Sequence, residues 1–150
     1  MSGQPYVAVI GPSEATADEA ECAEVVGRLL AERDAVVVCG GLGGVMEAAS
    51  RGAAGAGGTV LGILPGTDRA DANEHVTIAL TTGVGEMRNA LVVRAADAVI
   101  AVGGAYGTLS EIAFALRTGV PVVGIGTWDL DDVVDAPDAA TAVELALELA

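Results

Sequence analysis

The chain has 150 residues, which is long enough for one domain with a full hydrophobic core. Its 21 acidic residues against seven basic ones give a formal net charge of −14, and such a chain has no basic stripe through which to bind nucleic acid. No apolar run approaches the ~18 residues that a membrane span needs, so we expect no membrane partner. The acidic charge in turn leads us to expect no nucleic-acid partner.

The choice of basic residue is also informative. All seven basic residues are arginine, and this acidic, lysine-free composition resembles that of cytoplasmic proteins from salt-loving archaea. The N-terminus lacks a basic region before its first apolar stretch, so we expect a soluble, halophilic and cytoplasmic protein. The two cysteines, Cys22 and Cys39, are too few and too far apart for a disulfide framework or a metal site, and we expect Cys39 to be buried.

Short apolar runs that end in turns predict six strands, at residues 6–10, 35–39, 59–64, 75–80, 98–102 and 120–125. Segments with apolar residues at helical spacing lie between or after them, at about residues 17–30, 45–54, 86–96, 109–116 and 139–150. Polar loops are expected at 67–74 and 129–138. The alternation predicts a single-domain α/β fold, a doubly wound, Rossmann-like parallel sheet with helices on both faces, with its core over about residues 6–127.

Residues 99–111 form the most informative stretch. An apolar run breaks into glycines and then resumes with helical spacing. Such a turn leaves backbone N–H groups directed at whatever lies over the helix N-terminus, which is where phosphate binds. Thr108 and Glu111 allow two interpretations, a capping box or a contact to phosphate, and the segment alone does not separate them.

Three other turns follow predicted strands. Because parallel strands end at one edge of their sheet, we expect all four turns to open together on a phosphate-bearing ligand. Their candidate binding residues are Gly11, Ser13, Gly40, Gly41, Gly43, Gly44, Thr82, Gly83, Gly103, Gly104, Gly107 and Thr108. Their spacing matches neither the dinucleotide fingerprint nor a P-loop.

The order of these pieces resembles a known superfamily. The stretches Gly40-Gly-Leu-Gly-Gly-Val-Met46, Gly62-Ile-Leu-Pro65, Met87-Arg88 and Gly103-Gly-Ala-Tyr-Gly-Thr-Leu-Ser-Glu111 look like the LOG family, formerly misannotated as lysine decarboxylases. The resemblance covers roughly residues 6–127. The Arg88-Asn89 pair and the Gly-Thr-Leu-Ser-Glu ending resemble the branch that contains molybdenum cofactor carrier proteins and other Rossmann-like nucleotide-binding proteins.

The resemblance implies roles for individual residues. Characterised LOG enzymes are cytokinin riboside 5′-monophosphate phosphoribohydrolases, and matching their motifs makes Arg88 and Glu111 the catalytic candidates. It also adds Met46 and Asn89 to the nucleotide-binding set. A carboxylate at position 111 would stabilise the oxocarbenium-like transition state of N-glycosidic cleavage.

Three positions depart from the enzyme motif. Gly103 replaces a proline, Ala105 a glycine and Asn89 a lysine. The loss of the lysine removes a positive charge from the phosphate site, so hydrolysis is put in doubt more than binding.

Several side chains also have simpler interpretations. Arg88 could form a surface ion pair with Glu86. His75 has no metal-ligand spacing around it. Tyr106 could line the pocket, whereas we expect Trp128 to serve packing or a subunit contact.

Three functional hypotheses therefore stay open. The first is a cytoplasmic protein that binds a nucleoside monophosphate or a molybdopterin-type cofactor, with no metal ligands of its own and no other cofactor required. The second is a nucleoside 5′-monophosphate phosphoribohydrolase that uses Arg88 and Glu111. The third is a sensor or scaffold that binds a nucleotide as a signal. The resemblance further implies a homodimer or a higher homo-oligomer.

Overall fold

The computed structural model describes residues 3–150, so the first two residues of the predicted domain lie outside the described part. Within that range, seven strands form one parallel sheet in the order β4-β3-β2-β1-β5-β6-β7. The strands are β1 (Tyr6–Ile10), β2 (Val36–Cys39), β3 (Val60–Leu64), β4 (Ile78–Thr81), β5 (Ala98–Val102), β6 (Val122–Ile125) and β7 (Val134–Asp135). The predicted doubly wound α/β fold is confirmed.

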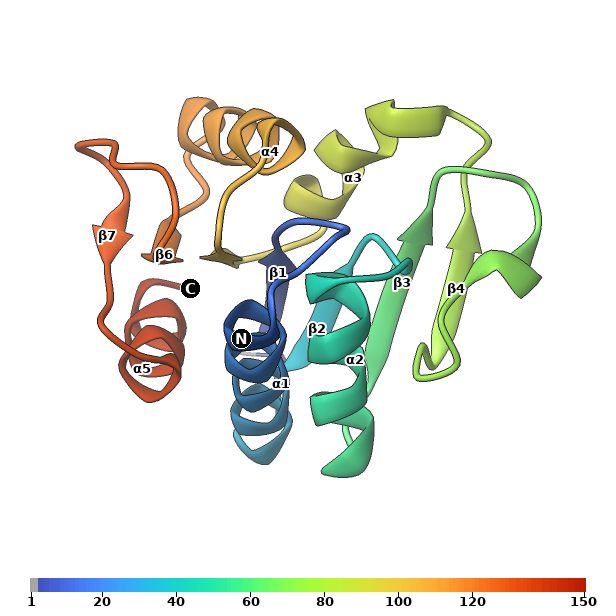
Figure 1. Cartoon of the computed structure of the whole chain (residues 1–150), viewed down its shortest axis with the longest axis horizontal. Helices are drawn as coiled ribbons and strands as arrows, with labels where there is room; N and C mark the ends of the chain where they lie inside the picture. Colours follow the sequence, from blue (N-terminus) through green and yellow to red (C-terminus); the bar gives the residue numbers. More distant parts are fainter. Residues whose placement is uncertain (1–2) are drawn as a thin grey trace.

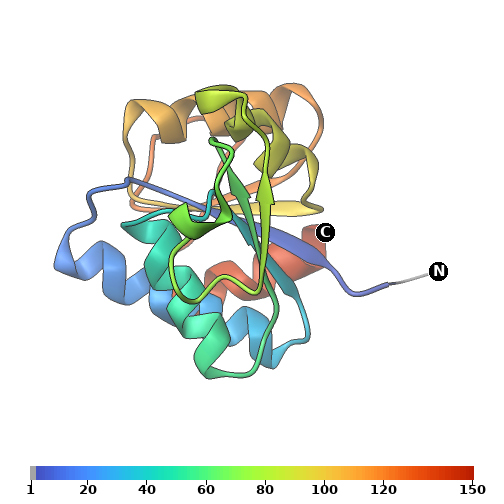
Figure 2. The same ribbon diagram turned by 90° about the vertical axis from the view of Figure 1, so that its right-hand side faces the viewer.

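Helices cover both faces of the sheet. The helices α1 (Ala17–Glu32), α2 (Val45–Gly55) and α5 (Ala139–Leu149) lie on one face, and α3 (Arg88–Arg94) and α4 (Tyr106–Arg117) lie on the other (Figure 1). The view from the side shows the same two layers, with the sheet between them (Figure 2). Short 3-10 turns precede β4 and α3, at η1 (Arg69–Asp71) and η2 (Gly85–Met87).

The inner strands of the sheet are apolar because both of their faces are covered. In β2, Val37 and Cys39 belong to the core on the α1 side, while Val36 and Val38 belong to the core on the α3 side. All four are buried, which is typical of a parallel sheet between helix layers. The predicted burial of Cys39 is confirmed.

The α1 side of the sheet depends on a tight helix pair. A Cβ atom added to Gly52 of α2 would lie 1.9 Å from the carbonyl oxygen of Glu24 in α1. The N-terminus of α1 is fixed by a capping box, in which the Thr16 hydroxyl accepts from the amide of Glu19 at 3.1 Å and the Glu19 carboxylate accepts from the amide of Thr16 at 2.9 Å.

The structure corrects three predicted boundaries. The fourth strand begins at Ile78 instead of residue 75, because the Asn73 side chain accepts from the amide of His75 at 3.0 Å and holds a turn there. The sixth begins at Val122, after the proline. The polar loop at 129–138 contains the two-residue strand β7, where Val134 pairs with Val123 at the edge of the sheet.

The strand order reverses at β1 and β5, which are parallel neighbours: β2, β3 and β4 follow outward from β1 on one side, and β6 and β7 follow outward from β5 on the other. Ligands of doubly wound sheets bind beyond the carboxyl ends of the strands at such a point.

In the described part of the chain, no helix has the length and apolar character required to cross a membrane.

Candidate functional site

A cavity of about 340 Å³ opens beyond the carboxyl ends of the central strands. It lies where the strand order reverses, and the turns after β1, β2 and β5 contribute to its wall. Its volume falls within the range of small-molecule sites. Its lining residues are Val9, Ile10, Gly11, Pro12, Ser13, Gly40, Leu42, Met46, Pro65, Glu86, Arg88, Asn89, Ala105, Gly107, Thr108 and Glu111.

The cavity brings together many of the residues that the sequence singles out. The predicted site residues in its lining are Gly11, Ser13, Gly40, Met46, Arg88, Asn89, Gly107, Thr108 and Glu111. The others lie outside that lining, and they are Gly41, Gly43, Gly44, Thr82, Gly83, Gly103 and Gly104.

Thr108 is not a helix cap. Helix α4 begins at Tyr106, three residues before the first helical residue that a cap at Thr108 requires, so the capping-box interpretation of Thr108 and Glu111, one of the two left open, is wrong. Thr108 is only 2% exposed, and its Oγ1 atom has no hydrogen-bond partner among the described residues. A buried hydroxyl without a partner is costly. It lies in the first turn of α4, whose free N–H groups attract anions.

Arg88 is a buried cation and not a surface one. It is 8% exposed and donates to the Oδ1 atom of Asn89 and, at 3.4 Å, to the carbonyl oxygen of Gly40. The alternative interpretation of Arg88 as one half of a surface ion pair with Glu86 is therefore wrong. The Nε atom of Arg88 has no partner within residues 3–150. Burial lowers the pKa of Arg88, and the nearby Glu111 carboxylate opposes that shift.

Glu111 lies one turn after Thr108 and is 8% exposed. Burial raises the pKa of this carboxyl from 4.5 to about 7, and the positive charge of Arg88 opposes the rise. Close to neutral pH, Glu111 therefore exists in both its protonated and its ionised form. The cavity thus holds an arginine, a free hydroxyl and a carboxyl that titrates near neutrality, as binding and catalytic sites often do.

Two of the glycines outside the lining shape the turns. Gly44 precedes α2 with a φ of +67°, and a Cβ atom there would lie 2.3 Å from the carbonyl oxygen of Pro12. Gly103 has a φ of +71°, and a Cβ atom there would lie 2.0 Å from the carboxylate of Glu19. Both positions need glycine for the path of the backbone.

Thr82 and Gly83 brace the edge of the sheet. The Thr82 hydroxyl donates to the carbonyl oxygen of Leu64 at 2.7 Å, and the amide of Gly83 donates to that of Gly66 at 2.9 Å. These bonds fix the end of β4 to the loop that follows β3. The turn after β4 opens at the predicted edge, but away from the cavity wall.

Sequence reasoning missed Leu42 and Glu86 as lining residues. Leu42 is an apolar residue inside a glycine turn, and only the fold reveals that Asn73 holds it by donating to its carbonyl oxygen at 2.9 Å. The sequence alone marks Glu86 only as an ion-pair partner for Arg88. Pro65 carried a signal, because it closes a predicted strand at the binding edge.

The aromatic residues lie beside the cavity. Tyr106 is 83% exposed and stacks on Trp128, with ring centroids 6.1 Å apart. Trp128 also donates to the carbonyl oxygen of Ala105 at 3.1 Å. Tyr106 does not line the pocket as the sequence allowed, and the pair instead supports the turn before α4. Across residues 3–150, no group of three or more His, Cys, Asp or Glu side chains is arranged to hold a metal ion.

Comparison with known proteins agrees with this architecture. The structure superimposes on the molybdenum cofactor binding protein of Rippkaea orientalis with a TM-score of 0.94 and 36% sequence identity, over 99% of each chain. It matches the molybdenum cofactor carrier protein of Chlamydomonas reinhardtii with a TM-score of 0.90 and 32% identity, over 98% of each chain. An uncharacterized protein of Archaeoglobus fulgidus is 44% identical over 119 residues, which are 79% of this chain and 78% of that protein.

These likenesses confirm the predicted resemblance to LOG-like and molybdenum cofactor carrier-like proteins. The model of the SLOG cluster4 family matches residues 4–148. The match spans the sheet, both helix layers and every lining residue of the cavity. The chain therefore belongs to the SLOG cluster4 family.

Proposed function

We propose that the cavity binds a small phosphate-bearing ligand, either a molybdopterin-type cofactor or a nucleoside monophosphate, and that the protein holds this ligand as a cofactor-binding or carrier protein. The observation that supports this most strongly is the unpartnered hydroxyl of Thr108. It is buried in the first turn of α4, in the same cavity as Arg88. A phosphate there would accept from the hydroxyl, from the amides of the helix and from the guanidinium group.

The rest of the cavity suits a flat heterocycle. Apolar side chains line part of its wall, among them Ile10, Leu42 and Met46. The carboxyl group of Glu111 and the amide of Asn89 can pair with the donors and acceptors of a pterin or a purine. When bound, a molybdopterin-type cofactor supplies a metal centre attached to its pterin, and the residues of this cavity would hold its phosphate and its ring.

Two of the relatives support the carrier hypothesis, because they are described as a molybdenum cofactor binding protein and a molybdenum cofactor carrier protein. The cytoplasmic location, the adaptation to high salt and the homo-oligomeric state expected from the sequence belong to the same proposal. With a net charge of −14, the protein offers little attraction to nucleic acid.

One observation favours the hydrolase as a second candidate. The carboxyl group of Glu111 has a pKa of about 7 and shares the cavity with Arg88. A carboxyl with such a pKa can donate or accept a proton at neutral pH, as the cleavage of an N-glycosidic bond requires. However, its protonated fraction cannot stabilise the positive charge that develops on the ribose.

A panel of ligands separates the two candidates. The purified protein, in concentrated salt, is mixed with AMP, GMP, CMP, UMP or a phosphorylated pterin, and its unfolding temperature and any released base are measured. A ligand at 100 times its dissociation constant stabilises the folded state by about 2.7 kcal/mol. For a domain of this size, that corresponds to roughly 5–10 °C.

Stabilisation without released base supports the carrier. Base release that disappears in Glu111→Gln would establish the hydrolase. If no ligand of the panel shifted the unfolding temperature and no base appeared, the proposed phosphate site would be wrong.

A further inference from the structure

Glu111 carries a buried carboxyl group that the fold itself does not use. Its side chain is 8% exposed and lines the cavity. Among residues 3–150, the hydrogen bonds around the cavity join Arg88 to Asn89, Gly40 and Met46, and none of them reaches the carboxyl oxygens of Glu111. Buried polar groups normally have a partner. This carboxyl group is therefore available to whatever occupies the cavity.

Arg88 shares the cavity with Glu111 but does not bond to it. In the described part of the chain, the two side chains form no ion pair. The guanidinium group instead donates to Asn89 and to the carbonyl oxygen of Gly40, and its Nε atom is left without a partner. The buried cation and the buried carboxyl group are thus both open to a ligand, and neither cancels the other through direct contact.

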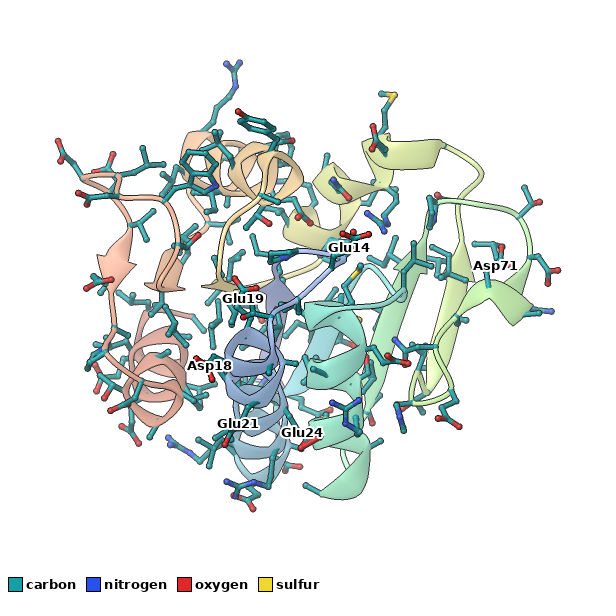
Figure 3. All side chains as sticks on the ribbon, in the orientation of Figure 1. Glu14, Asp18, Glu19, Glu21, Glu24 and Asp71 are labelled. Atoms are coloured by element: carbon teal, nitrogen blue, oxygen red, sulfur yellow. The ribbon has the colours of Figure 1, made fainter. Side chains whose placement is uncertain are left out.

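The charges around the cavity are mostly negative. Among the lining residues within 3–150, Arg88 is the one basic side chain, whereas Glu86 and Glu111 are two acidic ones. The neighbouring loop adds carboxylates and no cation, because Figure 3 shows Glu14 on the loop between β1 and α1 and Glu19 in the first turn of α1. With Glu86 and Glu111 both ionised, the cavity would carry a net negative charge before any ligand entered.

A phosphate group makes this charge balance worse. A phosphate monoester carries about −1.5 to −2 charges near pH 7, and Arg88 balances only part of that. Glu86 is exposed, so solvent screens its charge, but Glu111 is buried and would repel the phosphate at short range in a medium of low dielectric. Protonation of Glu111 removes this repulsion and turns its carboxyl group into a hydrogen-bond donor.

We propose that the cavity takes up its phosphate-bearing ligand together with one proton, which Glu111 holds as a neutral carboxylic acid. The inference rests on the proposed function, because it requires a phosphate in the cavity. The proton comes from the solvent and forms an O–H bond on the carboxylate of Glu111, and no bond of the ligand is broken. Burial already raises the pKa of Glu111 to about 7, and a bound anion raises it further. By linkage, a rise in pH favours release of the ligand.

No other group close to Glu111 is suited to hold this proton. The strands β5 and β6, on which α4 packs, contain no ionisable residue. Cys39 of β2 lies near Glu111 in the interior, but burial raises the pKa of its thiol, so it is already protonated at neutral pH. Arg88 of α3 keeps its charge, and Glu86 is exposed. Glu111 is therefore the group whose protonation follows the ligand.

The test is titration calorimetry of the full chain in concentrated salt, with AMP as the probe. The phosphate of AMP is already ionised above about pH 7, and its adenine does not titrate there. Measurements at about pH 8, in two buffers with different heats of ionisation, give the number of protons taken up for each ligand bound. Affinities at about pH 7 and about pH 9 give the pH dependence. A phosphorylated pterin replaces AMP if AMP does not bind.

We expect the wild type to take up close to one proton per AMP at about pH 8. Its dissociation constant should rise by roughly 10- to 50-fold between about pH 7 and about pH 9, because the ligand-free carboxyl group ionises over this range. Glu111→Gln should take up no proton, and its dissociation constant should change by less than about twofold over the same range. The matched control is Glu86→Gln, which removes the other carboxylate of the lining and should keep the proton uptake of the wild type.

The outcomes separate this inference from the proposed function. Binding of AMP without proton uptake by the wild type, or uptake that persists in Glu111→Gln, would overturn the inference and leave the phosphate site in place. Absence of binding by both AMP and the phosphorylated pterin would remove the phosphate site itself, and the proton uptake with it. Circular dichroism verifies that Glu111→Gln is folded, and the proton count of the wild type tests the inference without any variant.

Discussion

Replacing Glu111 by glutamine should stabilise the protein, and the gain should grow as the pH rises. Burial raises the pKa of Glu111 from 4.5 to about 7. Between these two values the folded protein holds a proton that the unfolded chain has released. The free energy of unfolding therefore falls as the pH rises through this window. At about 1.36 kcal/mol for each pKa unit, the full cost of the ionised carboxylate is roughly 3 kcal/mol.

The assay is thermal unfolding of the wild type and Glu111→Gln at about pH 5 and about pH 8.5. A cost of roughly 3 kcal/mol corresponds to about 6–12 °C in a domain of this size. We expect the variant to gain up to this amount at the higher pH and little at the lower one. This amount already includes the attraction to Arg88, because the pKa of about 7 is the net result of burial and of that opposing charge.

Comparing the two proteins at each pH cancels the titration of the other carboxylates. Glu86→Gln is the matched control, because it removes an exposed carboxylate from the lining of the same cavity. It should show no comparable pH-dependent gain. An equal change for Glu111→Gln at both pH values, or a variant less stable than the wild type at the higher pH, would refute the argument that burial sets this pKa.

Two glycine substitutions test the cavity and the helix pair. In Gly40→Ala, the new Cβ atom would lie 2.7 Å from Nη2 of Arg88 and 2.6 Å from Sδ of Met46. The ends of these two side chains are flexible and can move, so the fold should persist. A phosphorylated ligand should bind about tenfold more weakly or worse, as measured by calorimetric titration. Unchanged affinity would show that Arg88 does not contact the ligand. In Gly52→Ala, the clash is with the backbone of Glu24, so chemical denaturation should show a loss of about 1–3 kcal/mol. A gain, as helix propensity alone predicts, would contradict the close packing of α1 and α2.

The central fold was predictable because its signals are local. Each buried strand is a continuous apolar run that ends at a glycine or a proline, and the parallel order follows from the helices between the strands. The strand β7 was not predictable, because it has two residues within an acidic segment and forms only against β6. The start of α4 was hidden for a related reason. Gly107 lies inside its first turn, and glycine normally signals the end of a helix rather than its beginning.

The sequence predicts which turns form the candidate site, but it does not predict how deeply the side chains in that site are buried or which groups they contact. The positions of Arg88, Thr108 and Glu111 follow from the motif, yet their burial depends on contacts between segments far apart in the chain. Arg88 reaches Gly40, 48 residues away. A pattern of residue types therefore finds the edge of the sheet where a ligand binds, whereas the unpartnered hydroxyl and the raised pKa of Glu111 require the packed structure.

The most direct test of the phosphate site is Thr108→Val, measured for ligand affinity and for stability without ligand. Valine has the shape of threonine but lacks the hydroxyl. If that hydroxyl serves a bound phosphate, the affinity for a phosphorylated pterin or nucleotide should fall by roughly 10- to 100-fold. The ligand-free variant should be as stable as the wild type or about 1 kcal/mol more stable, because a buried, unpartnered polar atom is removed. Unchanged affinity together with a loss of stability would show instead that the hydroxyl serves the fold, and would contradict the proposed site.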